Sequence, residues 1–152
     1  MSTTRTRRVL HAPRERVFRA LTDPTAIATW RVPASMTAEV HEFDARVGGR
    51  FRISLTYDSP DRTGKSSAHT DTYHGHFAEI VPDERMVEVL EFETDDPAMW
   101  GEMRLSITLR DNGGGTELTA KHDGLPPGVD PDDNELGWAE ALDRLATLVE
   151  HG

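Results

Sequence analysis

The sequence predicts an α+β fold, in which a curved antiparallel sheet of about seven strands and a long C-terminal helix enclose a cavity. Strand-like segments follow one another from Met36 to Asp123, after a first strand and two short helices. The C-terminal residues instead carry apolar side chains three and four positions apart, which is typical of an amphipathic helix. A long sheet that bends around one late helix leaves space between them, so this order of elements predicts a pocket.

The N-terminal segment is expected to form a strand followed by two short helices. Residues Thr3 to Leu10 favour an edge strand, and Pro13 suits the first position of a helix, where its missing N–H is not needed. Asp23 is placed to cap a second helix that ends near Trp30. The first helix has an apolar stripe formed by Val17, Phe18 and Leu21.

Alternation of apolar and polar residues predicts the strands of the sheet. It is clearest from Phe51 to Tyr57 and from Glu102 to Leu109. The residues from Asp111 to Gly115 predict a hairpin loop, because glycine and asparagine accept the positive φ that such loops need. The remaining strands are expected at Thr37–Asp44, Tyr73–Val81, Met86–Glu93 and Thr116–His122.

The closing helix is predicted to present one apolar face to the sheet. Several possible helix caps precede it between Asp130 and Asn134. Its apolar face consists of Trp138, Ala141, Leu142, Leu145, Leu148 and Val149.

Composition and charge fit one domain, residues 1–152, and exclude several classes of function. The formal net charge of -10 argues against binding to nucleic acid, because neutralising phosphates requires a surplus of Lys and Arg. With no cysteine, disulfides and thiolate metal ligands are excluded. No apolar run is long enough for a membrane span, and the N-terminus has no apolar signal segment, so we expect a cytoplasmic protein without a membrane partner.

Four phrases of the sequence carry a family resemblance. They are residues 12–24, Gly48–Arg52, Glu79–Val87 followed by Phe92-Glu93, and Gly137-Trp138 ahead of the leucines of the closing helix. In this order they resemble the SRPBCC superfamily (the START and Bet v 1 relatives), and within it the group similar to the C-terminal domain of the activator of heat-shock-protein-90 ATPase. The chain departs from the usual pattern of this group at Thr29–Arg31, where an aromatic pair is common, and at Glu88, where an aromatic residue is common.

The resemblance implies a helix-grip fold whose central cavity holds lipids, polyketides or other apolar molecules. We therefore expect the protein to bind a small apolar or amphipathic molecule between the sheet and the closing helix, without a cofactor. The side chains expected to contact this ligand are Trp30, Phe43, Tyr57, Phe77, Phe92, Met103, His122 and Trp138.

His122 and Glu88 are the two candidates for chemistry in the cavity. His122 is in phase with Leu118 and Ala120, which predicts that it faces inward. It is either a general base or ligand-orienting group, or a histidine at the edge of the core bonded to the backbone. Glu88 shares its phase with Leu90, but the neighbouring valines are apolar too, so its direction stays open. If both point inward, they form a candidate acid–base pair.

A local cluster of His69, His74 and His76 with Asp71 raises the alternative of a metal site. No further histidine lies at fixed spacing, so solvated histidines at the start of a strand are the favoured reading and no metal is expected. The polar segment from Asp58 to Asp71 is expected to form a flap or an exposed hairpin end.

Two other functions stay open at this point. The first is an enzyme of the cyclase, dehydratase or hydrolase kind that uses His122 with Glu88 or Tyr57. The second is a co-regulator of a chaperone ATPase, which ranks lower because the eukaryotic activators have an additional N-terminal domain. A homodimer is expected to form, if at all, through the outer face of the sheet or an edge strand.

Overall fold

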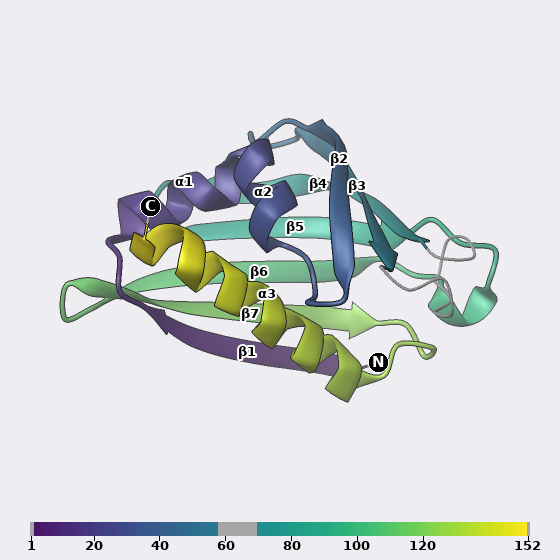
Figure 1. The fold of residues 1–152 in the computed structure, drawn as a ribbon. Coiled ribbons are helices and arrows are strands. Elements are labelled where there is room, and N and C mark those ends of the chain that lie inside the picture. The colour runs from purple at the N-terminus through teal and green to yellow at the C-terminus, as the bar shows by residue number, and fades with distance from the viewer. Residues whose placement is uncertain (1, 58–69, 152) are drawn as a thin grey trace.

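A computed structural model describes residues 2–57 and 70–151, which form one seven-stranded antiparallel sheet with its helices (Figure 1). The predicted α+β fold is confirmed. The elements in chain order are β1 (Ser2–Leu10), α1 (Arg14–Thr22), α2 (Pro24–Trp30), β2 (Met36–Phe43), β3 (Arg50–Tyr57), β4 (Thr70–Val81), β5 (Arg85–Phe92), the 3-10 turn η1 (Pro97–Met99), β6 (Met103–Asn112), β7 (Gly115–Leu125) and α3 (Pro131–His151).

The strand order is β1-β7-β6-β5-β4-β3-β2, so every strand from β2 to β6 pairs with the next strand along the chain. β1 joins the far side by pairing with β7, from Ser2 opposite Leu125 to Leu10 opposite Thr116. Helices α1 and α2 carry the chain from one edge of the sheet to the other. Figure 1 shows all three helices on one face of the sheet, which α3 crosses diagonally. α1 lies near the C-terminal end of α3, and α2 lies between α1 and β2.

The core lies between this face of the sheet and the three helices. The apolar face predicted for the closing helix packs inward, because Ala141, Leu142, Leu145 and Val149 are all buried. They pack with buried side chains of the sheet and of the first two helices, including Leu105, Ile107, Leu118, Val17, Leu21 and Ile27. Burial of these aliphatic side chains is the main force that holds α3 against the sheet.

Most helices and strands begin and end within a residue or two of the predicted positions. Local sequence features explain this agreement. The side chain of Asp23 accepts a hydrogen bond from the backbone N–H of Thr25 at 3.0 Å, as expected of a helix cap. Gly113 and Gly114 adopt φ of 54° and 91° in the hairpin before β7. Helix α1 begins at Arg14, so Pro13 occupies the cap position instead of the first helical position.

Three strands extend three residues beyond their predicted ends. β4 begins at Thr70, which pairs with Thr56, β6 continues to Asn112, and β7 continues to Leu125. Polar residues at these ends conceal the extensions in the sequence pattern. Residues 58–69, which make up most of the predicted flap and include His69, lie outside the described residues. Within the described ranges, no helix combines the length and the apolar character that crossing a bilayer would require.

Candidate functional site

A cavity of about 820 Å³ lies between the sheet, the first half of α3 and the loops at one end of the sheet. Its lining comes from all six strands from β2 to β7, from the segment after α2, from η1 and from the loop that leads into α3. Aromatic and apolar side chains form much of the wall, including Tyr57, Leu90, Phe92, Met99, Met103 and Trp138.

Arg31 is the cationic group of the cavity wall. It lies directly after α2, where the chain turns towards β2, and only 6% of its surface is exposed. Its guanidinium group donates two hydrogen bonds to Glu88 on β5, from Nη1 to Oε2 and from Nη2 to Oε1, both at 2.8 Å. Glu88 is 1% exposed, so the structure shows that its side chain faces inward. This bidentate geometry gives each buried charge a partner.

Three aromatic rings surround the guanidinium group. The Cζ atom of Arg31 lies 5.8 Å, 5.6 Å and 5.8 Å from the ring centroids of Phe51, Tyr73 and Trp138. Burial is the largest single effect and by itself would lower the pKa of Arg31, but the charges and hydrogen bonds of Glu88 and Tyr73 together outweigh burial, so this pKa is raised. Burial also raises the pKa of the Tyr73 hydroxyl, against the opposing charge of Arg31, and keeps Tyr73 protonated.

His122 lies on β7, on the same face of the sheet as Glu88. Leu105 of β6 pairs with Glu88 on one side and with His122 on the other, so the three residues form one row across the sheet. The imidazole is 6% exposed, and its Nδ1 atom is 3.4 Å from both Trp138 Nε1 and Asn134 Nδ2. Burial and then the charge of Arg31 lower the pKa of His122 to about 4, so that it is neutral at neutral pH.

The predicted ligand-contact residues fall into two groups. Tyr57, Phe92, Met103, His122 and Trp138 line the cavity. Trp30, Phe43 and Phe77 lie in or against the packed core and are not among the described residues that line the cavity. Their contacts explain this placement. The indole N–H of Trp30 donates to the carbonyl of Ala20, and the rings of Phe43 and Phe77 meet edge to face at 5.4 Å.

Arg31, Tyr73 and Asn134 are polar cavity residues that were not predicted as ligand contacts from the sequence. The sequence did contain a signal for Arg31. The chain departs from the family pattern at Thr29–Arg31 and at Glu88, and these two positions supply the two partners of the buried ion pair. Asn134 looked like one of several helix caps. Its actual neighbours come from β1 and β7, which sequence spacing does not reveal.

The contacts of His122 and Glu88 bear on the predicted acid–base pair. Both oxygens of Glu88 are held by Arg31, and Nδ1 of His122 faces two N–H groups. A neutral imidazole with such a low pKa is a weak base at neutral pH. The pair of His122 and Glu88 therefore stays a prediction, and one that these contacts do not favour.

The predicted histidine cluster is divided between the two faces of the sheet. Asp71 lines the cavity, whereas His74 and His76 line a separate groove of about 420 Å³ on the opposite face. Residues alternate between the faces along β4, which explains this separation. Within residues 2–57 and 70–151, no three or more His, Cys, Asp or Glu side chains are placed to hold a metal ion.

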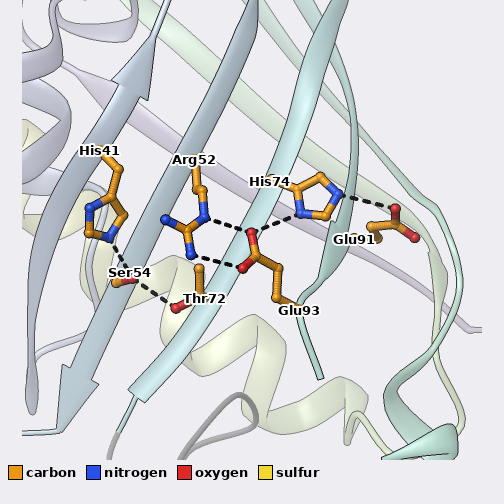
Figure 2. Close-up of polar contacts among 7 residues, drawn as sticks. All are labelled: His41, Arg52, Ser54, Thr72, His74, Glu91 and Glu93. Atoms are coloured by element: carbon orange, nitrogen blue, oxygen red, sulfur yellow. Dashed lines mark hydrogen bonds and ion pairs between the residues drawn. The ribbon is translucent and has the colours of Figure 1, made fainter. Parts of the chain in front are cut away.

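The outer groove carries its own polar network, shown in Figure 2. Glu93 accepts two hydrogen bonds from Arg52, at 2.8 Å and 3.0 Å, and lies 3.0 Å from Nδ1 of His74. The other ring nitrogen of His74 is 3.2 Å from Glu91. The hydrogen bond from Arg52 lowers the pKa of Glu93. These side chains satisfy one another at the solvent-facing surface and link neighbouring strands of the sheet.

Comparison with known proteins identifies the family. The family model described as "Activator of Hsp90 ATPase homolog 1-like protein" matches residues 11–150. The crystal structure of protein CV1439 from Chromobacterium violaceum is similar with 37% identity and a TM-score of 0.87, over 97% of this chain and 96% of that one. No curated protein matched the sequence.

More distant structures share the fold alone. Protein NE0264 from Nitrosomonas europaea is 23% identical, with a TM-score of 0.75 over 98% of this chain and 94% of that one. An AHSA1-like protein from Aeromonas hydrophila is 20% identical, with a TM-score of 0.73 over 99% and 93% of the two chains. The match of the family model over nearly the whole sequence agrees with the four phrases of the sequence. The chain therefore belongs to the family of Activator of Hsp90 ATPase homolog 1-like proteins.

Proposed function

We propose that this protein binds a small amphipathic molecule in the cavity between the sheet and α3. The observation that carries the proposal is a cavity of about 820 Å³ with apolar walls and a few buried polar groups. This volume lies in the range of sites that enclose drug-sized ligands, roughly 300–1,000 Å³. Apolar burial would supply the affinity, and the polar groups would orient the ligand.

The preorganisation of the polar groups supports binding more than acid–base chemistry. Arg31 is held by Glu88 and by three aromatic rings, so its position is fixed before a ligand enters. His122 is held by Trp138 and Asn134. Groups that are already ordered lose little conformational freedom when they contact a ligand. A general base at neutral pH needs a higher pKa than the value of about 4 that burial and Arg31 produce at His122.

Two measurements test the proposal. Native mass spectrometry of the protein purified from its own host should detect a bound small molecule. Titration with the neutral fluorophore N-phenyl-1-naphthylamine should show saturable binding with one site per chain. Ala141→Phe should weaken this binding at least tenfold, because Ala141 is 4% exposed and lines the cavity, where the new ring would occupy ligand volume.

Ala139→Phe is the matched control, since Ala139 is an exposed residue of the same helix and is not among the described lining residues. Circular dichroism should show both variants folded. The proposal would be refuted if the probe bound equally to both variants. It would also be refuted if the wild-type protein carried no small molecule and did not bind the probe. A role through the exterior, such as the ATPase activation that the family description names, would then take its place.

A further inference from the structure

The hydrogen bonds of His122 identify which ring nitrogen carries the proton. Trp138 Nε1 lies 3.4 Å from Nδ1, and an indole nitrogen can only donate. Nδ1 must therefore present its lone pair to Trp138. The two rings meet edge to face, with centroids 6.5 Å apart and an interplanar angle of 79°, which agrees with an N–H group directed at the imidazole.

A second chain of contacts gives the same answer. The hydroxyl of Thr4 donates to Asn134 Oδ1 at 2.6 Å, which orients the amide so that its nitrogen faces His122. Asn134 Nδ2 lies 3.4 Å from the same Nδ1 atom. Two donors from α3 thus converge on one acceptor, and β1 fixes the orientation of one of them. The neutral imidazole must carry its proton on Nε2.

The Nε2–H group of His122 is a buried donor. The Nε2 atom is buried and has no hydrogen-bond partner among residues 2–57 and 70–151. His122 is one of the residues that line the cavity. A buried N–H group without a partner is costly, and a ligand atom that accepts its hydrogen bond recovers that free energy. Because Nδ1 is occupied, the hydrogen-bonding group that His122 has left for a ligand is the Nε2–H donor and not an acceptor.

The charges around the cavity select against an anionic ligand. Arg31 is the only Lys or Arg among the described lining residues, and Glu88 already neutralises it. The carboxylates of the lining are Asp71, Asp96, Asp130, Asp133 and Glu140. A carboxylate ligand would meet their repulsion without an unpaired cation to compensate, whereas a neutral oxygen acceptor avoids this cost.

We infer that the cavity selects neutral molecules that place a carbonyl oxygen against His122 Nε2–H, with an apolar body against the aromatic wall. This inference rests on the proposed function and adds the chemical class of the ligand to it. Thr4, Asn134 and Trp138 act as positioning residues, because they hold the imidazole in the donor tautomer without contacting the carbonyl themselves.

Three related fluorophores test the inference. They are 6-propionyl-2-(dimethylamino)naphthalene, its 6-propyl analogue without the carbonyl, and 6-(dimethylamino)-2-naphthoate. The wild-type protein should bind the propionyl compound about tenfold more tightly than the propyl analogue, since one buried hydrogen bond separates them. The naphthoate should bind more weakly than the propionyl compound. Emission of the propionyl compound should be red-shifted when it is bound to the wild-type protein, compared with the same compound bound to His122→Asn. This shift is expected of a carbonyl that accepts a hydrogen bond.

Two substitutions of His122 separate the donor from the acceptor. His122→Asn keeps an oxygen near the Nδ1 position, for Trp138 and Asn134, but removes the donor at Nε2. It should abolish the preference for the carbonyl compound and the red shift. His122→Gln places an amide N–H near the Nε2 position. This variant should retain part of the preference for the carbonyl compound and part of the red shift. Long-range ¹H–¹⁵N correlation spectra at pH 7 should show the proton of wild-type His122 on Nε2.

The outcomes distinguish this inference from the proposed function. Equal affinity for the propionyl and propyl compounds, preference for the naphthoate, or a proton on Nδ1 would overturn the ligand class while leaving cavity binding intact. Failure of all three fluorophores and of N-phenyl-1-naphthylamine to bind would overturn both.

Discussion

Arg31 and Glu88 form a bidentate ion pair inside the protein, with both N–O distances at 2.8 Å and both side chains almost fully buried. The pair joins the end of α2 to the middle of β5, which are separated along the chain by the three strands β2, β3 and β4. It also places a positive charge close enough to His122 to lower the pKa of that imidazole. One ion pair thus links a helix to the sheet and contributes to the low pKa of a cavity residue.

We expect the ion pair to behave as a unit in stability measurements. Arg31→Met and Glu88→Leu should each lower the free energy of unfolding by about 3–5 kcal/mol, because each leaves one buried charge without a partner. The double variant should recover most of this loss, since apolar side chains of similar volume need no partner. Urea unfolding at pH 7 measures all four proteins. If the double variant lost as much unfolding free energy as the two single variants together, Arg31 and Glu88 would not act as a pair.

The same double variant should change the titration of His122. The charge of Arg31 is the second cause of the lowered pKa, after burial. Removing Arg31 and Glu88 together should therefore raise the midpoint above the value of about 4, but not to the ordinary 6.5, because burial remains. NMR titration of the His122 side chain measures the midpoint. An unchanged value would show that Arg31 has no influence on this group.

His122 should make the stability of the protein depend on pH in the mildly acidic range. Its pKa is about 4 when folded and 6.5 as the ordinary value, so the unfolded chain binds a proton first as pH falls. The folded state is then penalised progressively from pH 6.5 down to about 4. The full effect is about 3 kcal/mol, from 1.36 kcal/mol per pKa unit. The groups whose charges act on His122 are Arg31 and Asp123.

His122→Asn provides the comparison, because asparagine does not titrate. The difference in unfolding free energy between wild type and variant should shrink by about 3 kcal/mol between pH 7 and pH 4. Urea unfolding at several pH values gives this difference, and other carboxylates cancel because both proteins share them. A constant difference across this range would mean that His122 is not shielded from protonation in the folded state.

Gly75 should tolerate no side chain. A Cβ atom there would lie 2.1 Å from the carbonyl oxygen of Val89 and 2.8 Å from Cζ of Phe51, both inside the fold. Gly75→Ala should therefore lower the free energy of unfolding by about 1–3 kcal/mol or more, since β4 and β5 must separate to admit the methyl group. Thermal or urea unfolding measures the loss.

Gly137→Ala is the matched control in α3. A Cβ atom at Gly137 has an ordinary contact of 3.6 Å with Pro33, and alanine favours a helix over glycine. This variant should be stabilised by about 0.5–1 kcal/mol. A neutral result for Gly75→Ala, or a larger loss for Gly137→Ala, would be inconsistent with this close approach of β4 to β5.

Local sequence determined most of the secondary structure of this protein. Alternation along a strand, glycine in a hairpin and an aspartate at a helix start act over a few residues, so Phe51–Tyr57, Asp111–Gly115 and Asp23 are readable without the fold. The inward direction of His122 is readable for the same reason. The family phrases are local too, and they predicted the helix-grip architecture.

Tertiary structure decided what the site contains. Glu88 lies between two valines, so alternation leaves its direction open, and only its distant partner Arg31 explains a buried carboxylate there. Trp30 and Phe77 resemble Tyr57 and Phe92 in the sequence, because core and cavity walls are both built from inward apolar side chains. Position along the sheet and against α3 separates the two groups, and that position depends on contacts between residues far apart in the chain.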